Sequence, residues 1–326
     1  MNGNFLISAA KSFAHDEAGY DAQYGNDPII LDVGVAAIEV YRERAGDFSG
    51  PVIEIGCGTG LMSLGIIQAA AFPYVLLTDP SPAFLDIVRK KLGRAKLPTD
   101  KVGFAVLAGE EMSRLPPGGF ALILLRSTLH HIVDVNAFVS DAARALKPGG
   151  MMIMEEPCHE GFVLMATIAQ FFPLVMEHEG KRLTDAQRKT VQLFLDTVKF
   201  YSRRDVDKSL AEDKHLFRVD ELMKMGEKAG LTLDFLPNKT FYDWTPGRDA
   251  NPRHPSFVRF FHDYLKFSMS FDDELMKLFN DHLARYCDWI EELAQQGSGP
   301  YLHGVFVWKK TGRAPLVSLV RSAHIP

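Results

Sequence analysis

The chain has 326 residues, 47% hydrophobic and 24% charged, an ordinary composition for a globular protein of one large or two small domains. Its formal net charge of −5 argues against a nucleic-acid partner, because proteins that bind nucleic acids usually carry a basic face. The three cysteines are too widely spaced to indicate a disulfide framework or a zinc motif, so we expect no metal. No signal-peptide pattern is visible, and the most apolar run, Gly161 to Met176, is short for a membrane span. We therefore expect a cytoplasmic protein without membrane contact.

Residues 1–48 form an N-terminal segment that precedes the first predicted strand. Its apolar spacing predicts a helix from Pro28 to Arg44, and Tyr20 and Tyr24 lie upstream of that helix.

From residue 52 to residue 156 the chain alternates between strand and helix patterns. Helices are predicted at Pro82–Leu92 and Val135–Leu146. This alternation indicates a parallel sheet covered by helices on both faces, whose ligands bind at the carboxyl ends of the strands. The predicted strands are Val52–Ile55, Tyr74–Thr78, Val102–Leu107, Ala121–Leu125 and Met151–Met154.

The first strand runs into a glycine-rich turn, and a helix is expected from about Leu61. Gly56, Gly58 and Gly60 alternate, which differs from the G-x-G-x-x-G spacing of dinucleotide-binding loops. The acidic Glu54 before the turn would repel a pyrophosphate. The loop therefore suits a ligand with a positive charge and a compact carboxylate end.

This stretch resembles motif I of the class I S-adenosylmethionine-dependent methyltransferases, in which an acidic residue precedes Gly-x-Gly-x-Gly. The turn Leu146-Lys147-Pro148-Gly149-Gly150 before a strand is a second mark of that family. The resemblance implies a doubly wound, seven-stranded, mostly parallel sheet of the Rossmann-like methyltransferase fold. It also implies S-adenosyl-L-methionine as cofactor and S-adenosyl-L-homocysteine as product.

The resemblance assigns cofactor contacts along the chain. Asp79 stands 19 residues beyond Gly60 and is expected to bind the ribose hydroxyls; capping the helix near Pro82 is the alternative. Glu110 matches the family's acidic contact to the adenine amine, and Tyr20 or Tyr24 can close over the cofactor or merely pack the N-terminal segment. The full predicted set is Tyr20, Tyr24, Glu54, Gly56, Gly58, Gly60, Asp79, Pro80, Gly109, Glu110, Glu111 and Arg126.

Candidate acid–base residues follow the fourth and fifth predicted strands. His130 and His131 come after the fourth strand, and Glu156 and His159 come after the fifth. Any of them could accept a proton from a nucleophile. Structural hydrogen bonding, a helix cap or a salt bridge is the alternative for each.

Two insertions, 161–214 and 241–299, interrupt the core, which we place at 49–160, 215–240 and 300–312. They are predicted to form a helical cap, with a long helical region from Phe162 to Val198, a helix from Asp273 to Gln296, and a final core strand at Gly304–Trp308 after the cap. In the resembled family such inserts commonly build the substrate pocket, although the apolar segment from Phe162 could instead form a homodimer interface. The substrate candidates in the cap are Arg203, Arg204, Tyr242 and Trp244.

The hypothesis from sequence is methyl transfer to a small molecule, on oxygen, nitrogen, sulfur or a carboxylate, by in-line displacement. A base is needed only if the acceptor must lose a proton. The alternatives are methylation of a protein or RNA, or a cofactor-binding regulatory protein of the same fold without transfer activity.

Overall fold

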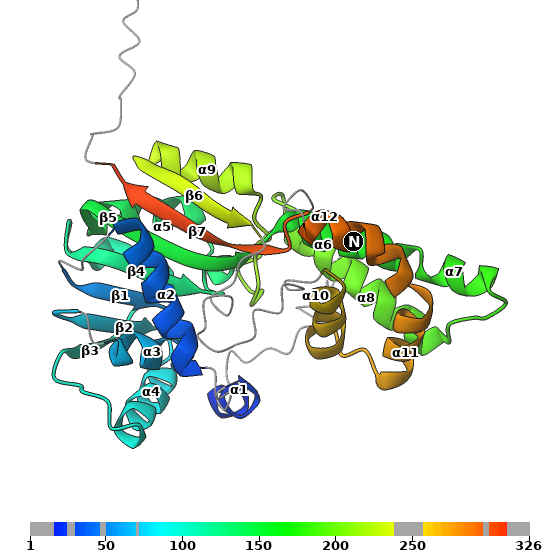
Figure 1. Ribbon diagram of the computed structural model, residues 1–326, viewed down its shortest axis with the longest axis horizontal. Coiled ribbons are helices and arrows are strands. Elements are labelled where there is room, and N and C mark those ends of the chain that lie inside the picture. Colours follow the sequence, from blue (N-terminus) through cyan, green and yellow to red (C-terminus); the bar gives the residue numbers. More distant parts are fainter. Residues whose placement is uncertain are drawn as a thin grey trace, which may run out of the picture.

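The computed structural model describes residues 16–24, 30–45, 50–69, 72–237, 257–295 and 300–311. Its centre is a seven-stranded sheet in the order β3-β2-β1-β4-β5-β7-β6 (Figure 1). Strands β1 to β5 pair in parallel, and β7 runs antiparallel to β5 and β6. The predicted doubly wound, mostly parallel sheet is therefore confirmed. The strands are β1 (Val52–Ile55), β2 (Val75–Asp79), β3 (Val102–Val106), β4 (Phe120–Arg126), β5 (Leu146–Pro157), β6 (Leu231–Pro237) and β7 (His303–Lys310).

The strands lie close to their expected positions, except for β5. β5 begins at Leu146 instead of Met151, because Leu146 still pairs with Phe120 of β4. The register shifts between this pair and the next, at the point where Pro148 has no N–H to give. β5 also ends at Pro157 instead of Met154, so Glu156, which pairs with Gly304 of β7, lies within the strand and not after it.

Alternate side chains of the strands enter two separate cores. Val52 packs with the helices of one face, whereas Ile53 and Ile55 pack with those of the other. α2 (Ile30–Ala45), α3 (Ser63–Gln68) and α4 (Pro82–Arg94) cover the first face. α5 (Val135–Ala145), α9 (Val219–Lys228) and the 3₁₀ turn η1 (Gly109–Arg114) cover the second.

The cap has a hydrophobic core of its own and lies to one side of the sheet (Figure 1). The region from Phe162 to Val198 is helical as expected, but it consists of three helices. The helix is interrupted at Phe171, ahead of Pro173, and again near Gly180, which adopts a φ of 69°. The cap elements are α6 (His159–Gln170), α7 (Phe172–His178), α8 (Asp185–Ser202), α10 (Phe257–Asp263), the π-helical turn η4 (Tyr264–Ser268), α11 (Asp273–His282), the 3₁₀ turn η5 (Ala284–Cys287) and α12 (Asp288–Gln295).

The helix expected from Asp273 to Gln296 is also interrupted, at Leu283. Leu275 and Phe279 are buried as expected, but Tyr286 and Trp289 are 53% and 68% exposed, because the 3₁₀ turn changes the helical phase after Leu283.

One described stretch, His159–His178, is long and apolar enough to cross a membrane by length and composition. In the fold it is divided between α6 and α7, and 33% of its most apolar 18-residue window is buried. The expected absence of membrane contact stays a prediction.

Candidate active site

The glycine loop connects β1 to α3 at the carboxyl edge of the sheet. Gly56, Gly58 and Gly60 have φ values of 68°, 51° and 87°, a region that favours glycine. A Cβ on Gly56 would lie 2.6 Å from Thr128, and one on Gly60 would lie 2.8 Å from Leu64. These two glycines are therefore required by the packing of the protein itself.

Gly58 differs from its two neighbours because the space beside its Cα is open. The nearest atom to a Cβ placed there is Cε1 of Tyr20, 4.0 Å away. Tyr20 lies on α1 (Glu17–Tyr24), where its ring packs edge-on against Phe84 with centroids 5.5 Å apart. Glu17 accepts a 2.7 Å hydrogen bond from Ser81, which ties α1 to the region after β2. α1 therefore covers the loop, with Tyr20 facing Gly58.

Asp79, the last residue of β2, organises the same loop. One carboxylate oxygen accepts from the backbone N–H of Gly58 at 2.9 Å, and the other accepts from Ser81 at 2.8 Å. Burial raises the pKa of Asp79, and these two hydrogen bonds oppose that rise. The N-cap of α4 is Ser81, so the alternative role of Asp79 as a helix cap is wrong.

Glu54 lies beneath the loop and is 2% exposed. It accepts a 2.6 Å hydrogen bond from Ser63 of α3, and burial raises the pKa of Glu54 to about 8. The side chain is therefore mostly protonated at neutral pH. The expectation that its negative charge sets the ligand preference of the loop needs this correction, since burial among strands suppresses the charge.

The remaining predicted cofactor residues lie along the same edge. Glu110 accepts from the backbone N–H of Val133 at 2.9 Å, whereas Glu111 holds the start of η1 through Ala108 and pairs with Arg114. The others are Pro80, which is exposed after β2, Gly109, which packs on Ile132, and Arg126, whose Nε lies 3.7 Å from Glu155.

These features fit S-adenosylmethionine. The opening at Gly58 is bounded by Tyr20, and the hydroxyl of Thr59 in the loop is buried without a hydrogen-bond partner among the described residues. Asp79, Glu110 and the loop amides are the groups that would hold it, with Tyr20 above them.

A second cluster lies where β4 and β5 end. The Glu156 carboxylate accepts from the backbone N–H groups of Thr128 at 2.8 Å and Leu129 at 2.6 Å, and lies 2.6 Å from Nδ1 of His130. Thr128 is also the residue that packs on Gly56. Glu156 therefore connects the histidines to the cofactor loop.

The cap contributes Asp213 to this cluster. Its Oδ1 lies 3.5 Å from Nε2 of His130 and 3.4 Å from Nδ1 of His131, and its Oδ2 accepts from the Tyr201 hydroxyl at 3.2 Å. The adjoining backbone N–H of Lys214 donates to the carbonyl of His130 at 2.8 Å. The cap and the sheet thus meet at the two histidines.

The environments of the two histidines drive their pKa values apart. Burial alone would lower the pKa of His130, but the charges of Glu156 and Asp213 outweigh it and raise this pKa to about 10. Burial and the charge of His130 lower the pKa of His131 to about 4, although its side chain keeps 40% exposure. At neutral pH the cluster therefore holds a charged imidazole beside a neutral one.

His131 has a defined tautomer. Its Nδ1 lies 2.9 Å from the carbonyl oxygen of Glu212, which can only accept a hydrogen bond. Nδ1 therefore carries the proton, and the lone pair is on Nε2.

Ligand atoms of His130, His131 and Asp213 lie within 4.8 Å of one another, a spacing that could also accommodate a cation. A protonated His130 has no lone pair for a metal, so we interpret the cluster as sharing protons. The expected absence of a metal stays a prediction.

The other predicted catalytic and substrate residues have different partners. His159 is influenced by Arg204 and Arg218, and its pKa is lowered mainly by burial. Arg203 pairs with Asp205 on the surface. Arg204 donates to the carbonyl of Leu216 and pairs with Glu221. The outermost candidates, Tyr242, Trp244 and the side chain of Tyr24, lie outside the described residues.

The sequence interpretation did not single out Asp213, Tyr201 or His303 as site residues. Asp213 lies in a charged stretch that looked like a solvated surface, and no local pattern distinguishes His303.

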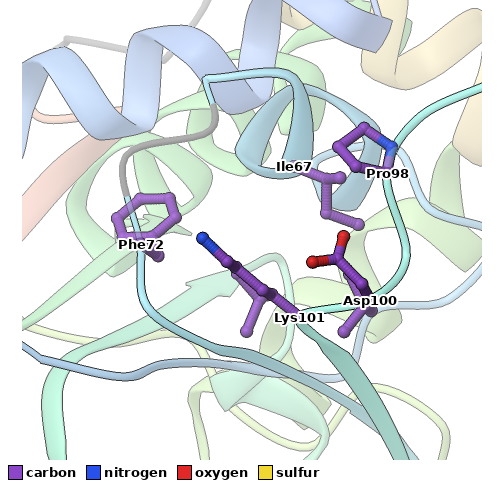
Figure 2. A pocket seen from close by; sticks show the side chains of 7 residues that line it. Ile67, Phe72, Pro98, Asp100 and Lys101 are labelled. Atoms are coloured by element: carbon purple, nitrogen blue, oxygen red, sulfur yellow. The ribbon is translucent and has the colours of Figure 1, made fainter.

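A small hollow of about 130 Å³ lies elsewhere, where β2 and β3 begin (Figure 2). It is lined by Phe72, Pro98 and Lys101 among others, at the opposite ends of the strands from the glycine loop. It is therefore separate from the proposed cofactor site.

A family model described as a methyltransferase domain matches residues 53–154. The chain is 32% identical over 100 residues to a ubiquinone biosynthesis O-methyltransferase of Methylobacterium nodulans, covering 31% of this chain and 38% of that protein. A reducing polyketide synthase of Preussia isomera is 32% identical over 108 residues, covering 32% of this chain and 4% of that protein. The chain therefore spans well under two thirds of the length of these relatives.

Longer matches are weaker in sequence. The ubiquinone biosynthesis O-methyltransferase of Xylella fastidiosa is 22% identical over 244 residues, covering 75% of this chain and 86% of that protein. A solved structure from Galdieria sulphuraria, described as a sarcosine dimethylglycine methyltransferase, is similar with a TM-score of 0.51 at 12% identity and covers 95% of both chains. The matched region, residues 53–154, carries the glycine loop and its acidic partners, so this part of the chain is a methyltransferase domain, similar to those of the class I S-adenosylmethionine-dependent methyltransferases.

Proposed function

We propose that this protein transfers the methyl group of S-adenosylmethionine to a small molecule held between the carboxyl edge of the sheet and the helical cap. The observation that carries the proposal is the position of His130. It is tied through Glu156 and Thr128 to the cofactor loop, and it faces Asp213 of the cap on its other side.

When bound, the cofactor supplies an electrophilic methyl group, so the protein has mainly to align the acceptor and exclude water. α1 covers the glycine loop from one side through Tyr20. On the other side of the proposed site, Asp213 and Lys214 of the cap contact the histidines. A covered site of this kind favours a small acceptor over the flat surface of a macromolecule.

The two histidines have different roles toward an acceptor that carries a hydroxyl. His130 stays charged between Glu156 and Asp213 and so holds the cluster together, and the lone pair on Nε2 of His131 is the group that would take the proton. Glu156 keeps His130 charged and oriented. With the cofactor bound, its sulfonium would supply the methyl group for in-line attack by the deprotonated oxygen, and S-adenosylhomocysteine would leave as the product.

The test is a transfer assay with methyl-labelled S-adenosylmethionine across small hydroxyl, amine, carboxylate and thioether compounds. Label in a hydroxyl compound, abolished by His131→Ala with cofactor affinity retained, is the expected result. Cofactor binding without transfer to any compound would contradict the proposal and favour the regulatory or macromolecular alternatives.

A further inference from the structure

His303 is a buried polar residue that the proposed mechanism does not use. It is 7% exposed, and neither ring nitrogen has a hydrogen-bond partner among the described residues. A buried polar group without a partner costs free energy, so its retention needs an explanation. Burial also lowers the pKa of His303 to about 4, so the ring is neutral and offers one N–H and one lone pair.

The position of His303 places it beside the proposed acceptor site. It is the first residue of β7 and pairs with Pro157, the residue after Glu156 on β5. Because β7 runs antiparallel to β5, the start of β7 lies at the same edge as the carboxyl ends of the parallel strands. This is the edge that carries the glycine loop and His130.

A row of aromatic rings leads from His303 through Phe260 and Phe162 to Tyr264 in the cap. Phe260 of α10 stacks on His303 with centroids 5.4 Å apart. Phe162 of α6 meets Phe260 at 5.9 Å and Tyr264 of η4 at 4.8 Å. Burial raises the pKa of the Tyr264 hydroxyl, and the negative charge of Asp213 raises it further.

These four side chains, His303, Phe260, Phe162 and Tyr264, are here called the aromatic wall. None of them carries a positive charge at neutral pH. Arg203 and Arg204, which could have met a carboxylate or phosphate, are committed to Asp205 and to Leu216 and Glu221 instead.

We infer that the aromatic wall contacts the methyl acceptor, that His303 forms its hydrogen bond, and that the acceptor is an uncharged apolar or aromatic molecule bearing a hydroxyl or carbonyl group. This inference rests on the proposed function and specifies its acceptor class. Rings provide flat apolar surface for the body of such a molecule, and the orphan imidazole satisfies its polar group.

The test is calorimetric titration of the full chain, loaded with S-adenosylhomocysteine, with four probes: 2-naphthol, naphthalene, sarcosine and phosphoethanolamine. We expect 2-naphthol to bind more tightly than the other three. We expect His303→Phe, which keeps the stacking on Phe260, to weaken the binding of 2-naphthol at least tenfold, or by about 1.4 kcal/mol. The affinity for naphthalene should not change. His303→Gln, which keeps a donor and an acceptor, should restore part of the affinity.

Three results would overturn the inference: no binding of 2-naphthol to the wild type, equal affinity of 2-naphthol for His303→Phe, or preference for either charged probe. A loss of folding in His303→Phe on thermal scanning would also count against it, because an orphan polar group should be replaceable by an apolar ring without loss of stability. Affinity for S-adenosylhomocysteine is measured first in every variant. If the wild type does not bind S-adenosylhomocysteine, the proposed function is wrong. If it binds S-adenosylhomocysteine but not 2-naphthol, only this inference is wrong.

Discussion

Replacement of Glu156 by glutamine tests whether a buried ion pair joins β5 to the histidines. The carboxylate accepts hydrogen bonds from Thr128, Leu129 and His130, and its side chain is fully buried. Glutamine keeps one oxygen for the two backbone donors but places an amide N–H₂ against Nδ1 of His130. Loss of one partner of a buried pair costs about 3–5 kcal/mol.

The same contact predicts how the effect depends on pH. The pKa of His130 rises from 6.5 in the unfolded chain to about 10 in the folded protein, which corresponds to at most about 5 kcal/mol of stability. Because the folded pKa is the higher one, this stability is fully present below pH 6.5 and is lost as the pH rises through about 10. The difference between wild type and Glu156→Gln should therefore have nearly its full value at pH 6.5 and should mostly disappear by pH 9.5.

Urea unfolding of both proteins at pH 6.5 and pH 9.5 measures this difference. Glu54, whose pKa of about 8 lies in the same window, is present in both proteins and cancels. Glu177→Gln, an exposed substitution on α7, is the matched control and should change the free energy of unfolding by less than about 0.5 kcal/mol. An equal difference at the two pH values, or one below about 1 kcal/mol at pH 6.5, would refute the ion pair.

Three further predictions concern the cofactor and the cluster. Gly58→Val should abolish binding of S-adenosylhomocysteine in calorimetry, because the valine side chain would enter the opening below Tyr20. Gly93→Val, on an open helix surface, is the control and should bind normally. Equal binding by the two variants would contradict the loop assignment. Asp79→Ala should weaken the affinity for S-adenosylhomocysteine by about 1–3 kcal/mol and also lower the thermal midpoint, because the backbone N–H groups of Gly58 and Ser81 lose their acceptor. A change in stability alone would assign Asp79 a purely structural role. Treatment with EDTA should leave the rate of methyl transfer unchanged, because a protonated His130 cannot bind a metal; activity lost and then restored by added Mn²⁺ or Zn²⁺ would show that the cluster binds a cation.

Local sequence was sufficient for the sheet and for the residues that surround the glycine loop. Strand and helix periodicity predicted the parallel sheet, and the edge rule for such sheets placed Gly58, Asp79 and Glu110 together. These predictions succeed because each depends on neighbours in the chain: the turn needs its glycines, and the strands need their apolar alternation.

Tertiary structure decided the charges and the partners. The acidity of Glu54 is visible in the sequence, but its protonation depends on burial beneath the loop. The adjacency of His130 and His131 is likewise visible, but their opposite pKa shifts arise from Glu156 and Asp213, which other segments bring to them. Single-residue patterns carry no information on such distant contacts.

The same limit applies to the cap. Apolar spacing predicted its helices but not the breaks at Phe171 and Leu283, because a helical pattern continues through positions where the packing of a compact cap requires the chain to turn. His303 has no distinguishing local pattern at all. Its burial against Phe260, without a hydrogen-bond partner among the described residues, exists only once the cap has packed on the start of β7. The sequence by itself thus determined the sheet and the cofactor loop, whereas packing of the cap against the sheet decided the residues proposed to meet the acceptor.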